Sequence, residues 1–176
     1  HIYKMDYGTM LAAHVEAEAD ITVGCIEVPL DQAHAFGVMA VDEYQRIMEF
    51  VEKPERPIPM SGNSDMVLAS MGIYVFRTEV LIEELLRDAD TDESSRDFGG
   101  DIIPDALKRR RVTAFPFQSD PGGRRAYWRD VGTVDAFWAA NLELIRVSPE
   151  LNLSDRDWPI WTYQDQVHSA KFVFDD

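Results

Sequence analysis

Residues 36–54 predict a β-hairpin, and this hairpin constrains the fold more than any other stretch of the chain. Residues 36–41 are apolar and partly β-branched, residues 42–45 are polar, and residues 46–51 again suit a strand. Pro54 has no backbone N–H to donate, so it ends the second strand. The hairpin therefore places Glu52 and Lys53 side by side at a strand end, where they could hold a small polar ligand.

The rest of the chain alternates between predicted helices and strands. We expect strands over about 21–28, 68–76, 112–117 and 127–131, and helices over about 8–19, 78–87, 98–111 and from Thr133 onward. Residues 30–35 are a short connector with about one helical turn, and 54–65 and 88–96 are loops. Alternation of this kind predicts an α/β layered domain.

Three of the helices carry further predictions. Asp6 caps the first, in which Leu11 and Val15 form an apolar i, i+4 pair. The helix at 78–87 should bury a stripe of Val80, Leu81, Ile82 and Leu85. Thr133 caps the last helix, whose broad apolar face contains Val134, Phe137, Trp138, Asn141, Leu142 and Ile145.

Composition excludes several classes of protein. The 176 residues include 17 basic and 32 acidic side chains, a net charge of −15, which argues against broad nucleic-acid binding. A site for an anionic substrate would then need a placed Lys or Arg, or a metal ion. No apolar run approaches the ~20 residues that span a bilayer. The single cysteine, Cys25, fits a reducing cytoplasm and is best read as a small buried side chain.

Each candidate site residue also has a structural interpretation. Glu52 and Lys53 could be a solvated rim. Asp130 follows a strand and precedes a helix, a place suited to ligands and metals, but it could pair with Arg129 or cap the helix. Residues 97–101, DFGGD, could cap the next helix, or could let the chain approach a ligand closely at Gly99 and Gly100. For the basic run 108–111 we favour stabilisation of a helix C-terminus over phosphate binding. His14 and His168 show no metal-ligand spacing.

Four ordered motifs carry a family resemblance. FGVMAVDEYQRIMEFVEKP, LASMGIYVF, DFGGDIIP and YWRDVGTVDAFWAANLELI occur in this order and together resemble glucose-1-phosphate adenylyltransferases of the bacterial glycogen type. The opening HIYKMDYGTML and the tail RDWPIWTYQDQVHSAKFV resemble the same family. The resemblance implies a Rossmann-like (GT-A-like) domain with a mixed central sheet over residues 1–147, then an extended linker over 148–176.

Site residues follow from the resemblance position by position. Lys53 would hold the phosphate of glucose 1-phosphate, and Glu52 would accept hydrogen bonds from sugar hydroxyls. Gly37, Ser70, Tyr74, Asp97, Phe98 and Trp128 would complete the sugar pocket. Asp130 would be a catalytic carboxylate that binds Mg²⁺, with a second aspartate that in the family precedes the residue matching His1.

The resemblance also implies parts outside this sequence. These are an upstream glycine-rich loop for the nucleotide triphosphate and a C-terminal left-handed β-helix, so we expect the isolated chain to show no turnover. The intact protein would be a cytoplasmic homotetramer with metabolite effectors, using ATP and no nucleic acid or membrane partner. Two alternatives stay open: a sugar-1-phosphate nucleotidyltransferase that uses UTP, dTTP or GTP, and a non-catalytic regulatory homologue that binds a sugar phosphate.

Overall fold

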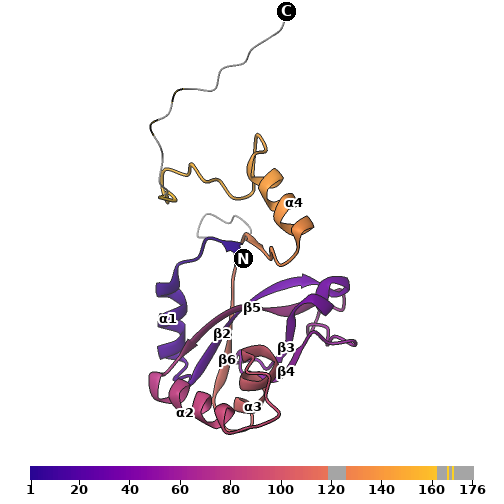
Figure 1. The fold of residues 1–176 in the computed structure, drawn as a ribbon, viewed down its shortest axis with the longest axis vertical. Coiled ribbons are helices and arrows are strands. Elements are labelled where there is room, and N and C mark those ends of the chain that lie inside the picture. The colour runs from indigo at the N-terminus through magenta and orange to yellow at the C-terminus, as the bar shows by residue number, and fades with distance from the viewer. Residues whose placement is uncertain (119–125, 162–165, 167, 169–176) are drawn as a thin grey trace, which may run out of the picture. The chain divides into compact units, whose positions relative to one another are not determined.

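The computed structural model describes residues 1–118, 126–161, 166 and 168. It divides into two compact units, one formed by residues 4–126 and the other by residues 1–3 together with 127–176. Figure 1 shows the elements of both units along the chain. Each unit is described by itself below.

The larger unit is built on a five-stranded sheet in the order β4-β3-β5-β2-β6. Its strands are β2 (Ile21–Pro29), β3 (Gly37–Val41), β4 (Ile47–Glu52), β5 (Met66–Phe76) and β6 (Val112–Pro116). Strand β2 pairs antiparallel with β5 and parallel with β6, so the sheet is mixed, as predicted. The α/β class is confirmed.

The predicted hairpin forms the β3–β4 edge of this sheet. Gly37 lies opposite Glu52, and Val41 lies opposite Ile47. The Asp42 carboxylate closes the turn by accepting the backbone N–H groups of Tyr44 and Arg46, each at 2.9 Å. The turn is therefore fixed by a local side-chain acceptor, the usual role of an aspartate at this position.

The sheet curls so that the residues just before β4 contact β6, the strand at the opposite edge. Arg46 forms a β-bridge with Thr113, and the Ala114 N–H donates to the Gln45 carbonyl over 2.8 Å. The apolar side chains enclosed by this curl form the main core. Its fully covered members include Ile21, Val23, Cys25, Ile103, Ala106 and Val112. Burial raises the pKa of the Cys25 thiol, which supports its interpretation as a core side chain.

The first helix, α1 (Tyr7–Glu16), begins at the predicted cap, where the Asp6 carboxylate accepts the Gly8 N–H at 2.8 Å. Its buried residues are Met10 and His14, whereas the predicted pair Leu11 and Val15 is exposed. The connector at Leu30–Ala35 is a 3-10 helix, η1, in agreement with the expected helical turn.

The buried stripe predicted for the second helix, α2 (Thr78–Ala89), is wrong at two of its four residues. Val80 is buried and Leu81 is partly buried, but Ile82 and Leu85 are exposed, and the second fully buried position is Glu84. A carboxylate can occupy this place because two arginines from a later segment bind it. Charge pairing across the fold, which periodicity does not report, therefore decides which face of α2 is inward.

The predicted helix over 98–111 is shorter and less regular than expected. It consists of a π-helical turn, η2 (Phe98–Ile102), followed by α3 (Ile103–Ala106), with Pro104 in the first turn of α3. The basic run 108–111 directly follows the C-cap of α3, Leu107, and the Arg109 guanidinium donates to the Asp105 carbonyl of its last turn at 3.0 Å, in agreement with the predicted role at a helix C-terminus. Arg109 and Arg110 also bind Glu84 of α2, which ties the end of this segment to that helix.

The smaller unit contains two short strands and one long helix. Strand β1 (Ile2–Tyr3) pairs antiparallel with β7 (Trp128–Arg129), and α4 covers Val134–Leu144. The Thr133 hydroxyl accepts the Ala136 N–H at 3.1 Å, which confirms the predicted cap. The expected apolar face of α4 is not buried, because Val134, Phe137, Trp138 and Ile145 are all exposed. Two-residue strands offer too little surface to cover it.

Residues 148–161 contain no helix or strand, and residues 162–165, 167 and 169–176 of the predicted linker lie outside the described part. The division at 147 and 148 stays a prediction. Among the described residues, no helix is long and apolar enough to cross a membrane.

Candidate functional site

Glu52 is the centre of the candidate site in the larger unit. It is the last residue of β4, and its carboxylate lies against two glycines from different elements, Gly37 in β3 and Gly99 in η2. Burial raises the pKa of Glu52, with Asp97 adding to the effect and Lys53 opposing it. A partly buried carboxylate of this kind can accept hydrogen bonds from a ligand, and sugar hydroxyls are suitable donors.

Lys53 follows directly and has an unusual backbone conformation. Its φ is +46°, in the left-handed region that side chains other than glycine rarely adopt. Its N–H still donates to the Phe36 carbonyl at 3.0 Å, so the ladder extends one residue past β4. The ammonium lies 3.9 Å from Glu52, and the side chain is 65% exposed. An exposed pair at this distance adds little stability, so the ammonium can turn to a ligand phosphate at little cost.

Aromatic rings line the site on one side. Tyr74 of β5 stacks on Phe98 of η2 with ring centroids 5.5 Å apart, and Phe76 meets both rings edge-on. The Tyr74 pKa is raised mainly by burial, while a hydrogen bond to the Ser70 side chain opposes the shift. Stacked and edge-on rings hold one another in fixed positions, so the start of η2 is tied to the sheet at this point.

The structure confirms that Asp97 caps a helical turn, as one of its two interpretations predicted. Its carboxylate accepts the Gly100 N–H at 2.6 Å at the start of η2. The same carboxylate raises the pKa of Glu52, so it belongs to the surroundings of the site. Its role as a wall of a sugar pocket stays a prediction.

Seven predicted site residues thus come together in one unit, namely Gly37, Glu52, Lys53, Ser70, Tyr74, Asp97 and Phe98. The sequence indicated Gly99 only as one of two glycines that could lie close to a ligand, and the structure places it against Glu52. The motif DFGG contains the only available signal, a glycine pair directly after two predicted site residues.

Asp130 and Trp128 lie in the smaller unit, beside His1. The His1 Nδ1 is 3.3 Å from an Asp130 carboxylate oxygen, and its ring stacks on Trp128 at 5.2 Å. Neither structural interpretation of Asp130 applies, because Arg129 binds Glu143 at 2.9 Å and Thr133 caps α4. Asp130 also accepts the Gly132 N–H at 3.2 Å.

The carboxylate oxygens of Asp130 are suitable ligands for one side of a magnesium site. Mg²⁺ prefers carboxylate oxygens and is usually held by one or two of them together with substrate phosphates. Asp130 supplies one such group, and its side chain is 37% exposed. Across the described residues, no cluster of three or more His, Cys, Asp or Glu side chains could hold a metal alone.

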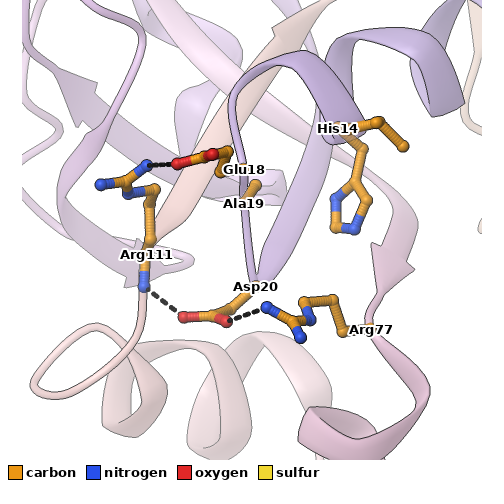
Figure 2. A pocket seen from close by; sticks show the side chains of 7 residues that line it. His14, Glu18, Ala19, Asp20, Arg77 and Arg111 are labelled. Carbon is orange, nitrogen blue, oxygen red and sulfur yellow. Dashed lines mark hydrogen bonds and ion pairs between the residues drawn. The ribbon is translucent and has the colours of Figure 1, made fainter.

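A separate hollow of about 670 Å³ opens at the start of β2 and contains none of the predicted site residues. Figure 2 shows that its charged side chains face one another. Arg77 lies 3.9 Å from Asp20, Arg111 lies 3.6 Å from Glu18, and the Arg111 N–H donates to Asp20 at 3.0 Å. Because these cations already have carboxylate partners, the hollow has no surplus charge to attract an ion.

Comparison with known proteins places this geometry in a family. The model of the family described as nucleotidyl transferase matches residues 1–146, well over half of the chain. The chain belongs to the nucleotidyl transferase family. This membership agrees with the predicted α/β domain and with a mixed sheet that ends in a polar site.

Relatives with high identity share one name. The chain is 66% identical, over its whole length, to the glucose-1-phosphate adenylyltransferase of Nitrosococcus oceani, and 61% identical to that of Methylococcus capsulatus. It is 60% identical to the enzyme of the same name from Dechloromonas aromatica. The chain spans only 42%, 42% and 41% of the length of these three relatives.

Proposed function

We propose that the protein containing this chain transfers the adenylyl group of ATP to glucose 1-phosphate, giving ADP-glucose and pyrophosphate. The observation that carries the proposal is the identity of 66% over the whole chain with a glucose-1-phosphate adenylyltransferase. The gathering of six other predicted sugar-phosphate residues around Glu52 also supports it.

In this reaction a phosphate oxygen of the sugar phosphate attacks the α-phosphorus of ATP, and pyrophosphate leaves. Such transfers depend on positioning and on neutralising charge rather than on covalent help from the protein. Lys53 binds the acceptor phosphate as a charge-assisted anchor, a contact on the order of 1.5–3 kcal/mol. Glu52 accepts hydrogen bonds from the sugar hydroxyls. The pocket around them is shaped by the Ser70 hydroxyl, the Gly37 backbone and the Tyr74–Phe98 stack.

Asp130 and a second carboxylate would hold Mg²⁺ in the proposed enzyme. When bound, the ion supplies charge neutralisation at the reacting phosphate. A chain with a net charge of −15 needs such cations where two anionic substrates meet. The support for this role is the oxygen-donor chemistry of the partly exposed Asp130 carboxylate.

The wider biology is part of the same proposal. ADP-glucose formation commits glucose to glycogen, and we infer a cytoplasmic homotetramer regulated by metabolites. The family resemblance supports the assembly and the effectors, and a single buried cysteine is in keeping with a reducing compartment.

The deciding experiment uses a protein of the relatives' full length that contains this chain. ATP and glucose 1-phosphate with Mg²⁺ should yield ADP-glucose, with UTP, dTTP and GTP as matched alternatives. Preference for another nucleotide would identify a different sugar nucleotidyltransferase. Binding of glucose 1-phosphate without any product would instead favour a regulatory homologue.

A further inference from the structure

The carboxylate of Glu52 lies close against the backbone of two glycines. A Cβ atom placed on Gly99 would lie 2.5 Å from a Glu52 carboxylate oxygen and 3.1 Å from the carboxyl carbon. A Cβ on Gly37 would lie 2.7 Å from the same oxygen. The carboxylate therefore occupies the space left by two missing side chains, one on the sheet and one on η2.

Gly99 is needed for space and not for backbone freedom. Among the glycines in the described part of the chain, Gly62 and Gly72 have positive φ and Gly99 does not. It is buried in the π-helical turn between Phe98 and Ile102, a conformation that alanine also adopts. Only the absent side chain therefore distinguishes Gly99 from alanine in this position.

We propose that Gly99 is a positioning residue for substrate recognition, which lets the Glu52 carboxylate lie deep enough to meet the hydroxyls of the sugar. This inference rests on the proposed function, because the role of Glu52 as a sugar acceptor belongs to that proposal. It adds a residue of η2 to the determinants of sugar affinity and names the contact through which that residue acts.

A methyl group on Gly99 would displace either the backbone of η2 or the Glu52 carboxylate, and the neighbouring contacts indicate which of the two moves. The start of η2 is held by the Phe98–Tyr74 stack and by the Asp97 cap, so the turn resists movement. The Glu52 oxygen is the far end of a flexible side chain, so it moves first. Gly99→Ala should therefore shift the carboxylate while costing little stability.

Two other glycines show why this substitution is informative. A Cβ on Gly37 would also lie 2.5 Å from the ring of Phe50, a core side chain, so that substitution disturbs packing as well. A Cβ on Gly100 would have its nearest neighbour, an Asp97 oxygen, at 3.4 Å. Gly100→Ala is therefore a matched control in the same turn, with the same change in unfolded-chain entropy.

The test compares Gly99→Ala and Gly100→Ala in the full-length enzyme. We expect Gly99→Ala to raise the KM for glucose 1-phosphate about tenfold or more, the effect of weakening hydrogen bonds to a charged group. The KM for ATP should change by less than about twofold in both variants, and Gly100→Ala should match the wild type. Equal KM values for glucose 1-phosphate in the two variants, whether raised or normal, would overturn the inference.

A double variant separates displacement of Glu52 from general damage to the turn. Glu52→Asp shortens the side chain by one methylene and frees space beside residue 99. If displacement is the cause, Glu52→Asp should cost affinity in the wild type but little or none in the Gly99→Ala background. Fully additive losses would contradict the inference, even if Gly99→Ala alone proved unstable.

Calorimetric titration with glucose 1-phosphate gives a readout independent of turnover. A wild type that binds this ligand but makes no ADP-glucose would refute the proposed function and still allow the Gly99 comparison. A wild type that binds no glucose 1-phosphate would overturn both. An active wild type whose affinity is unchanged by Gly99→Ala would overturn the Gly99 inference alone.

Discussion

Replacing Glu84 by glutamine tests how the segment that carries Phe98 and Gly99 is held in place. The Glu84 side chain is only 1% exposed, and it accepts hydrogen bonds from Arg109 and, at 2.7 Å, from Arg110. Both arginines follow α3 directly, in the segment that begins with Phe98 and Gly99 of η2. Burial alone would raise the pKa of Glu84, but the two arginines outweigh it and hold the pKa below its ordinary value.

The size of the effect follows from this geometry. Removing one partner of a fully buried ion pair costs about 3–5 kcal/mol. Arg109 and Arg110 keep 27% and 20% of their side chains exposed, and glutamine retains one acceptor oxygen. We therefore expect a loss of about 2–3 kcal/mol in the local stability of α2 and α3.

Hydrogen exchange on peptides from α2 and α3 measures this loss directly. Amides there should exchange about 30- to 150-fold faster in Glu84→Gln than in the wild type. Glu83→Gln is the control, since Glu83 also binds Arg110 but is 57% exposed, and it should change exchange by less than about fivefold. Similar rates in the two variants would refute the idea that Glu84 anchors this segment.

The stability difference between the wild type and Glu84→Gln should also depend on pH in a definite direction. Because the pKa of Glu84 is lowered on folding, its contribution is present above the ordinary value of 4.5 and is lost as the pH falls through the lowered pKa. The difference between wild type and Glu84→Gln should therefore shrink in acid. A difference that grows in acid would contradict the assignment of the ionised carboxylate.

Two further predictions concern Asp130 and His14. Asp130→Asn should cut kcat heavily at saturating substrate, and near-normal turnover in Mg²⁺ would remove Asp130 from the metal site. His14 donates to or accepts from Thr22 at 2.8 Å, and burial, then Arg77, lower its pKa while Asp20 opposes them. Stability should therefore be lost as the pH falls from about 7 to 5, below the ordinary value of 6.5. Thermal unfolding of His14→Gln should show a flatter pH profile, and an equally steep one would exclude His14 as the cause.

Local patterns in the sequence predict the elements near the site well. The hairpin at 36–54, the Asp6 and Thr133 caps and the long strand ending at Phe76 depend on residues close together in the chain. The same is true of Asp97, whose capping bond spans three residues. Short-range hydrogen bonds and alternation fix these features, so a single sequence contains the necessary information.

Long-range pairing is where prediction from the sequence ends. Periodicity assigns Ile82 and Leu85 to the interior of the protein, but α2 buries Glu84 because arginines 25 and 26 residues later bind it. The contact of Gly99 with Glu52 likewise joins η2 to β4, and the DFGG motif does not indicate which residue Gly99 contacts. The seven gathered site residues were named through a family resemblance and not through their spacing.

The central claim is that the hairpin end binds the phosphate of a sugar phosphate, and Lys53→Ala tests it most directly. In the full-length enzyme the KM for glucose 1-phosphate should rise about tenfold or more, roughly 1.4 kcal/mol, with kcat falling less. Lys108→Ala, which removes another exposed lysine from the same unit, should leave that KM unchanged. An unchanged KM for glucose 1-phosphate in Lys53→Ala would contradict the account.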